Sequence, residues 1–173
     1  MPSRVHTCVM HGEWSDDDLQ HEVSEGRWVA DNVNAVPKTT VGTLVPVGFD
    51  AYARILFPRV GRGSEQLAVI SRLLAEHTGT PHDCWFALWE GNTALDEIRD
   101  STPSVQIAGY NYILLRGPVE RAIDSYRGLR PNIWWPADHS WCMAPHFDFP
   151  YAFLGASNQC ISDLFQLSEI EAR

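Results

Sequence analysis

The sequence of 173 residues contains no apolar run that approaches the roughly 18 residues typical of a transmembrane helix. Its first residues also lack the uninterrupted apolar stretch of a secretory signal peptide. Positive charge is scarce, because 13 Lys and Arg stand against 22 Asp and Glu, for a formal net charge of -9. Such a chain repels phosphate backbones and anionic lipids. We therefore expect no nucleic acid and no membrane among its partners, whereas a basic protein is a reasonable partner.

Cysteine is scarce as well. Cys8, Cys84, Cys142 and Cys160 are widely spread, and no two of them have the two-residue spacing of zinc knuckles and redox pairs. Free thiols in a reducing cytoplasm are the simplest interpretation, so the predicted localisation is cytoplasmic, with export by a non-classical route left open. Cys84 and Cys142 lie in apolar, strand-like surroundings, where burial raises the pKa of a thiol and suppresses its nucleophilicity.

Two catalytic motifs are incomplete. The stretch VGRGSE lacks the lysine of a phosphate-binding P-loop. Gly155, Ala156 and Ser157 resemble the start of a nucleophile elbow, but Gln159 stands where the motif needs its last glycine. Ser157 is better interpreted as a helix N-cap. No cofactor is expected, and a non-enzymatic role is favoured over an enzymatic one.

The composition is that of a globular protein, with 45% hydrophobic and 20% charged residues. A chain of this length is typical of one domain, so we predict a single domain over residues 1–173. Its first 40 residues are polar and irregular, apart from a short helix expected over Asp16, Asp17 and Asp18 behind Ser15. The sequence leaves open that residues 1–38 form a loosely packed N-terminal extension.

Strands and helices are both predicted. Ser64 is the expected cap of the clearest helix, which ends before Gly79 and Pro81. Further helices are expected after Pro118, with Tyr126 on the apolar face, and after Ser157, where the residues predicted to be buried are Cys160, Ile161, Leu164 and Phe165. Expected strands are 39–46, 49–58, 84–91, 110–117, 141–149 and 151–157. This irregular mixture predicts an α+β fold with a mixed or mostly antiparallel sheet and about three flanking helices.

The stretch WWPADHSWCMAPHFDF, residues 134–149, has two competing interpretations. Asp138, His139, His146 and Asp148 are metal-ligand types, and they motivate the alternative of a small metal-dependent hydrolase. The spacing matches no known hydrolase motif, so the favoured interpretation has no metal site. The tryptophans Trp134, Trp135 and Trp141 are expected to bury apolar area in the core, each with an acceptor for its indole N–H.

Several segments carry a resemblance, chiefly VGTLVPVGFDAYARILFP, HTGTPHDCWFALWEG, YNYILLRGP and the stretch from WWPADHSW to ISDLF. Together they resemble a family of uncharacterised proteins frequent in actinobacteria, over most of residues 41–166. The stretch after Pro58 looks shortened relative to that family. The ending GASNQCISDLF is similar to the endings of SUKH-superfamily immunity proteins. That resemblance implies an acidic domain that neutralises a toxin by covering its basic surface.

The favoured function is therefore a cytoplasmic, acidic, immunity-like module that binds a protein. Aromatic and charged residues around the aromatic segments are its predicted contact residues, because tryptophan is over-represented at binding hot spots. These residues, expected to be exposed, are Trp89, Glu90, Trp135, Asp138 and His139.

Overall fold

The computed structural model describes residues 12–34, 44–57, 63–145 and 150–173. Its centre is an eight-stranded antiparallel sheet with the strand order β3-β4-β2-β5-β6-β7-β1-β8. The strands are β1 (Ala51–Leu56), β2 (Cys84–Trp89), β3 (Val105–Ile107), β4 (Tyr110–Gly117), β5 (Ile133–Pro136), β6 (Cys142–Pro145), β7 (Tyr151–Ala156) and β8 (Glu171–Ala172). With the helices around this sheet, the predicted α+β class is confirmed, and the sheet is antiparallel.

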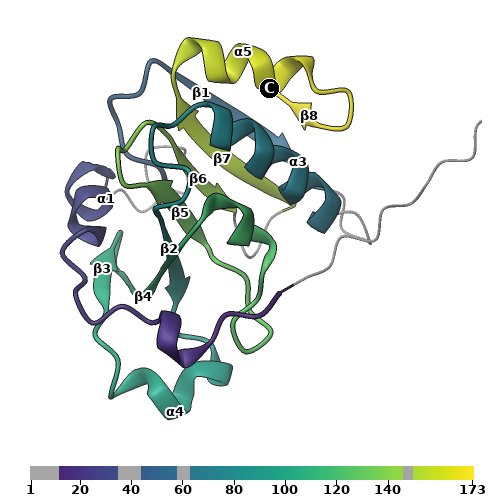
Figure 1. Ribbon diagram of the computed structural model, residues 1–173. Helices are drawn as coiled ribbons and strands as arrows, with labels where there is room; N and C mark the ends of the chain where they lie inside the picture. The colour runs from purple at the N-terminus through teal and green to yellow at the C-terminus, as the bar shows by residue number, and fades with distance from the viewer. Residues whose placement is uncertain (1–11, 35–43, 58–62, 146–149) are drawn as a thin grey trace, which may run out of the picture.

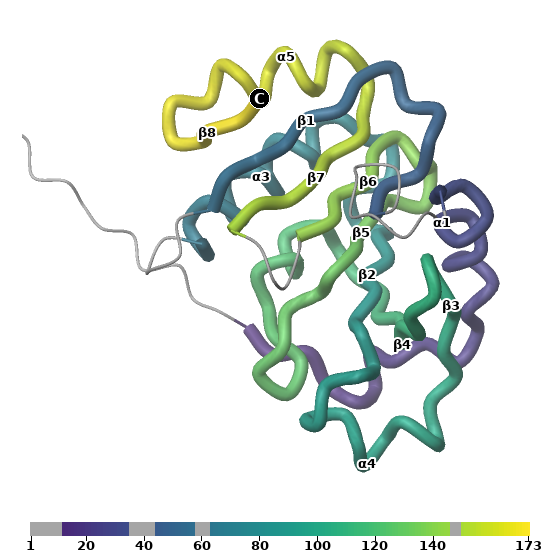
Figure 2. The backbone as a smooth tube through the Cα atoms, turned by 180° about the vertical axis from the view of Figure 1, so that it is seen from behind, coloured from purple at the N-terminus to yellow at the C-terminus, as the bar shows by residue number. Residues whose placement is uncertain are grey.

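The helices of the described residues are unequal in length. The α-helices are α1 (Gly26–Asn32), α3 (Gly63–Glu76), α4 (Asp96–Arg99) and α5 (Asn158–Gln166), and the short 3-10 helices are η1 (Asp16–Asp18), η2 (Thr93–Leu95) and η3 (Val119–Ile123). Figure 1 looks onto the face of the sheet that α3 covers, and Figure 2 shows the strands from behind, in front of α3. The short helix α1 lies at the side of the sheet near β3 in both views.

Both faces of the sheet are buried, and each has its own core. On the α3 face, residues of α3, α5 and η3 pack with alternate strand residues such as Phe86, Trp134 and Leu154. The strand residues that alternate with these, such as Trp85 and Trp135, point to the other face, where Val29 of α1 and Val45 pack on them. Strands buried on both faces lose the alternation of apolar and polar residues. That is why β2 reads as the continuous apolar run CWFALW.

The expected helix after Ser15 and the three principal helices are present, with two corrections to their details. Ser64 lies inside α3 rather than capping it, and its hydroxyl accepts a hydrogen bond from Arg130. Ser157 caps α5 as predicted, because its hydroxyl accepts from the Cys160 N–H at 3.2 Å. Phe165, however, is 52% exposed, so its predicted burial is wrong. The apolar stripe of α5 extends over Cys160, Ile161 and Leu164.

Other predictions from the sequence agree less well with the structure. The helix expected after Pro118 is the five-residue 3-10 helix η3, which ends before Asp124. The strand expected over 39–46 lies largely outside the described residues, and its described part, 44–46, is not a strand. Three short elements, α1, β3 and β8, were not predicted, nor was β5, which reads IWWP.

The described part of the N-terminal third, residues 12–34, packs against the rest of the chain. Trp14 is 2% exposed and its ring lies 5.0 Å from that of Phe86. Leu19 and Gln20 pair with β4 beyond the end of β3. Residues 1–11 and 35–38 of the suggested extension lie outside the described residues. Among the helices that the structure describes, none has the length and apolar character needed to cross a membrane.

Candidate functional site

The five predicted contact residues do not form one site. Trp89 ends β2 and Glu90 follows it, whereas Asp138 and His139 follow β5. Strands β2 and β5 are antiparallel, with Cys84 opposite Pro136. Asp138 and His139 therefore lie beside the start of β2, and Trp89 and Glu90 lie at its other end. The length of a six-residue strand, about 20 Å, separates the two groups.

Trp135 is not a surface residue. It is 0% exposed and belongs to the core between the sheet and α1, so its prediction as an exposed contact residue is wrong. The burial of Trp134 (1% exposed), Trp135 and Trp141 (0%) confirms that the tryptophan-rich segment belongs to the core. Trp141 donates its indole N–H to the Leu74 carbonyl at 3.0 Å, but that of Trp135 has no acceptor among the described residues, so the acceptor predicted for it is not found there.

Asp138 is committed to holding a turn. Its Oδ2 atom accepts from the Thr78 hydroxyl at 2.8 Å and from the Gly79 N–H at 2.7 Å, and its Oδ1 atom accepts from the Ser140 N–H at 3.0 Å. Burial opposes ionisation of this carboxyl, but the hydrogen bonds from Ser140, Thr78 and Gly79 outweigh it and lower its pKa. The side chain thus ties the segment after α3 to the turn after β5.

This arrangement predicts that Asp138→Asn reduces the acid sensitivity of the fold. A lowered pKa in the folded state stabilises the protein fully above the unfolded pKa, near 3.8, and this contribution is lost as the pH falls through the folded value. The variant lacks the ionisable group. Its free energy of unfolding in urea should therefore be lower than that of the wild type at pH 7, and the difference should shrink as the pH falls below 3.8 and through the folded pKa. The exposed Asp31→Asn serves as the control, and a parallel decline of all three proteins contradicts the assignment.

His139 faces α1. Its backbone has a φ of 58°, and its ring stacks on Trp28 with 4.0 Å between the ring centroids and 9° between the planes. Its Nε2 atom lies 3.7 Å from a carboxylate oxygen of Glu25, just before α1. The His139 side chain therefore holds α1 against the turn between β5 and β6. The adjacent Asp138 contacts the segment after α3 instead.

The metal-site alternative gains no support from its described half. Asp138 contacts the turn after α3 and His139 contacts α1, so these two side chains do not converge. His146 and Asp148 lie outside the described residues. Within 12–34, 44–57, 63–145 and 150–173, no three His, Cys, Asp or Glu side chains come together as metal ligands. The hydrolase interpretation stays an untested prediction.

The described cysteines are buried free thiols. Burial raises the pKa of Cys84 and of Cys160 to about 12, with nearby carboxylates adding to the effect. Burial alone raises the pKa of Cys142. Since the thiolate is the nucleophilic form, these three thiols are unreactive at neutral pH.

Acidic side chains gather at the end of the sheet where β2 finishes. Arg127 joins η1 to α4, because its guanidinium lies 3.6 Å from Asp16 and 3.1 Å from Glu97. Figure 1 shows η1 and α4 next to each other at the bottom of the molecule. Six exposed carboxylates on and beside these two elements form what we call the acidic end: Glu13, Asp16, Asp17, Asp96, Glu97 and Asp100.

The arginines of this region are already paired. Arg99 lies 2.6 Å from Asp96 and donates to the Glu90 carbonyl, and Arg127 bridges Asp16 and Glu97. Arg121, beneath η1, pairs with Asp18 at 3.1 Å and with Asp124 at 2.9 Å. These three arginines pair with Asp16, Asp18, Asp96, Glu97 and Asp124, whereas Glu13, Asp17 and Asp100 of the acidic end form no ion pair with the described residues. The excess negative charge projects into solvent.

An aromatic pair adjoins the acidic end. Trp89 and Tyr110 meet edge to face, with ring centroids 6.2 Å apart, and Tyr110 is 52% exposed. Glu90 accepts a hydrogen bond from the Asn111 side chain at 2.7 Å, which joins the end of β2 to the start of β4. Trp89 also lines a hollow of about 370 Å³, together with Leu88, Asn92 and the chain from Gly128 to Asn132.

Comparisons with known proteins give no relative. No protein-family model, no curated protein and no solved structure matches this chain. The resemblances to the actinobacterial family and to the SUKH superfamily therefore stay predictions from the sequence.

Sequence reasoning missed most of the acidic end. The acidic run at Asp16 and its neighbours predicts only the start of a short helix, and the carboxylates of α4 lie between the two expected strands 84–91 and 110–117. The pattern DDD and the net charge were the available signals. Neither of these two signals indicates that η1 and α4 lie together. That contact depends on Arg127, which is distant from both elements in sequence.

Proposed function

We propose that this chain is a non-enzymatic, cytoplasmic binding module whose acidic end docks on a basic surface of a partner protein. The observation that carries the proposal is the concentration of exposed carboxylates on η1 and α4, around arginines that are already paired. Complementary charge accelerates encounter and selects the partner more than it adds affinity. An immunity-like role, covering the functional basic surface of a toxin, is the specific form of this proposal that the SUKH resemblance suggests.

The aromatic pair beside the carboxylates supports a protein partner. Interfaces combine a less charged, aromatic centre with a polar rim, and Trp and Tyr are frequent among the residues that dominate binding energy. Trp89 and the half-exposed Tyr110 supply such a centre, with Glu90 between them and α4. Of the five contact residues predicted from the sequence, Trp89 and Glu90 are the two at this surface.

The test uses two variants of the whole chain with the same net charge. Asp17→Lys with Asp100→Lys reverses two carboxylates of the acidic end, and Asp50→Lys with Glu76→Lys reverses two exposed carboxylates elsewhere. Each protein is immobilised and exposed to a lysate of the native host at low salt. A basic protein retained by the wild type is identified, purified and titrated against all three.

The acidic-end variant should bind this partner at least about tenfold more weakly, since like charges in contact cost several kcal/mol and 1.4 kcal/mol is tenfold in affinity. The control variant should bind like the wild type at matched salt. Two results count against the proposal: retention of no basic protein by the wild type, or equal weakening in both variants, which would show only a dependence on net charge. A toxin gene beside this one in the genome would favour the immunity-like form.

A further inference from the structure

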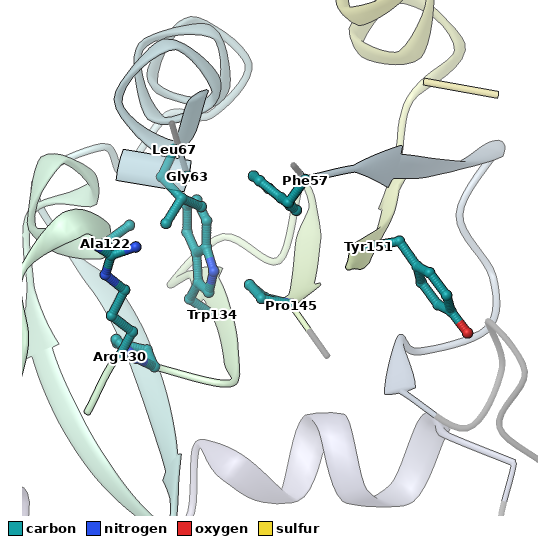
Figure 3. A pocket seen from close by; sticks show the side chains of 9 residues that line it. Phe57, Gly63, Leu67, Ala122, Arg130, Trp134, Pro145 and Tyr151 are labelled. Carbon is teal, nitrogen blue, oxygen red and sulfur yellow. The ribbon is translucent and has the colours of Figure 1, made fainter. Parts of the chain in front are cut away.

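A separate hollow of about 180 Å³ opens on the α3 face of the sheet. Figure 3 shows it between the start of α3 and the ends of β1, β5 and β6, with Phe57, Leu67, Trp134 and Pro145 around it. The adjoining segments 58–62 and 146–149 lie outside the described residues. An apolar cavity of about 150 Å³ accepts a benzene ring. The hollow is therefore of a size for one ring or a branched aliphatic group.

The polar group of a nearly buried side chain faces this apolar space. Trp134 is 1% exposed and lines the hollow, and its indole N–H makes no hydrogen bond with the described residues. Figure 3 shows the indole nitrogen on the side of the ring that faces Phe57 and Pro145. This N–H is not among the fully buried donors that lack a partner, so it is accessible from the hollow, and an acceptor that enters the hollow can bond to it in place of water.

The rim is positively polarised. Arg130 lines the hollow, is exposed to solvent, and forms no ion pair within the part of the chain that the structure describes. Its guanidinium donates to the hydroxyl of Ser64, in the first turn of the 14-residue helix α3. Gly63, the first residue of α3, also lines the hollow, so the positive end of the helix dipole lies at the rim, which favours negative charge there.

We propose that this hollow binds a small monocarboxylate with an apolar body of about one ring. The body fills the space between Phe57, Leu67 and Pro145, while the carboxylate accepts from Arg130 and from the indole N–H of Trp134. Both polar groups are donors without an acceptor function, which selects an anion or a carbonyl over a cation. The net charge of -9 and the adjacent Glu65 oppose the anion, so the dissociation constant is expected on the order of 0.1–1 mM.

The probe is phenylacetate, titrated into the full-length, ¹⁵N-labelled protein. The indole N–H signal of Trp134, identified by its loss in Trp134→Phe, should shift on binding. Phenylacetamide has the same shape without the charge and should bind at least tenfold more weakly, and 2-phenylethylamine should leave the signal in place. Absence of a shift at 10 mM phenylacetate, about ten times the weakest affinity expected, overturns the proposal. Equal binding of acid and amide overturns the role of Arg130.

Two variants test whether the positive charge of Arg130 is the one that binds the carboxylate. Arg130→Gln keeps a polar side chain and should weaken phenylacetate binding at least tenfold, while Arg27→Gln, an exposed arginine on α1, should bind as the wild type does. Loss of binding in both variants shows a nonspecific dependence on charge and contradicts the assignment. The inference is independent of the proposed protein partner. Asp17→Lys with Asp100→Lys should retain phenylacetate binding even where it loses the partner, so the two proposals fail separately.

Discussion

Trp141→Ala should lower the free energy of unfolding by about 3–5 kcal/mol, the range measured for tryptophan and phenylalanine truncated in a core. The side chain is 0% exposed and packs edge to face on Trp134, with 5.6 Å between ring centroids. It also holds the end of α3, because its indole N–H donates to the Leu74 carbonyl at 3.0 Å. Domains are stable by only about 5–15 kcal/mol, so this one change removes a large part of the total. Urea unfolding followed by circular dichroism measures it.

Two controls separate the contributions of Trp141. Trp141→Phe keeps an aromatic ring but removes the donor to Leu74, and should cost about 1–3 kcal/mol. Phe165→Ala, on the exposed side of α5, should change stability by less than about 1 kcal/mol, although the sequence pattern places this residue on the apolar stripe. A Trp141→Ala protein within 1 kcal/mol of the wild type would show that the tryptophan-rich segment is not part of the core.

The elements that could be predicted from sequence are those whose pattern is local. Helix α3 has apolar residues at three- and four-residue spacing, and β4 is an apolar, aromatic run closed by Gly117. Strand β5 escaped prediction because its tryptophans serve opposite faces: Trp134 packs under α3 and Trp135 packs under α1. Strand β5 offers no alternation of apolar and polar residues, and with only four residues, the last of them Pro136, it also lacks the length of apolar run by which β2 could be recognised.

The candidate surfaces could be predicted only in part, because they depend on contacts between distant segments. Trp89 and Glu90 are predicted contact residues because they lie around an aromatic segment, and they adjoin the acidic end. Nothing local indicates that Asp16 and Glu97 meet through Arg127, or that Arg130 stands over Ser64. Asp138 and His139 were chosen by residue type, whereas the structure gives each a neighbour that it holds in place.

Arg121→Ala should cost about 3 kcal/mol and loosen the N-terminal segment. The Arg121 guanidinium stacks over Trp14, 3.6 Å from the ring centroid, and bonds to Asp18 and Asp124. Asp124 is only 8% exposed and also accepts from the Gly12 N–H at 2.9 Å. Removing the arginine leaves a nearly buried carboxylate without its cation, a loss that costs about 3–5 kcal/mol for fully buried pairs. The lower end applies because a quarter of the Arg121 side chain remains exposed.

A second substitution distinguishes the loss of the Arg121–Asp124 ion pair from the loss of the packing of Arg121 on Trp14. Arg121→Ala with Asp124→Asn removes the stranded charge, and should recover about half of the lost stability, since an uncharged amide costs less to bury than a carboxylate. Amide hydrogen exchange should locate the remaining effect in residues 12–20, where Trp14 and Asp18 lose the guanidinium that joins them to η3. If exchange accelerates uniformly over the sheet instead, Arg121 stabilises the fold as a whole, and the N-terminal segment does not depend on this one side chain for its place against the core.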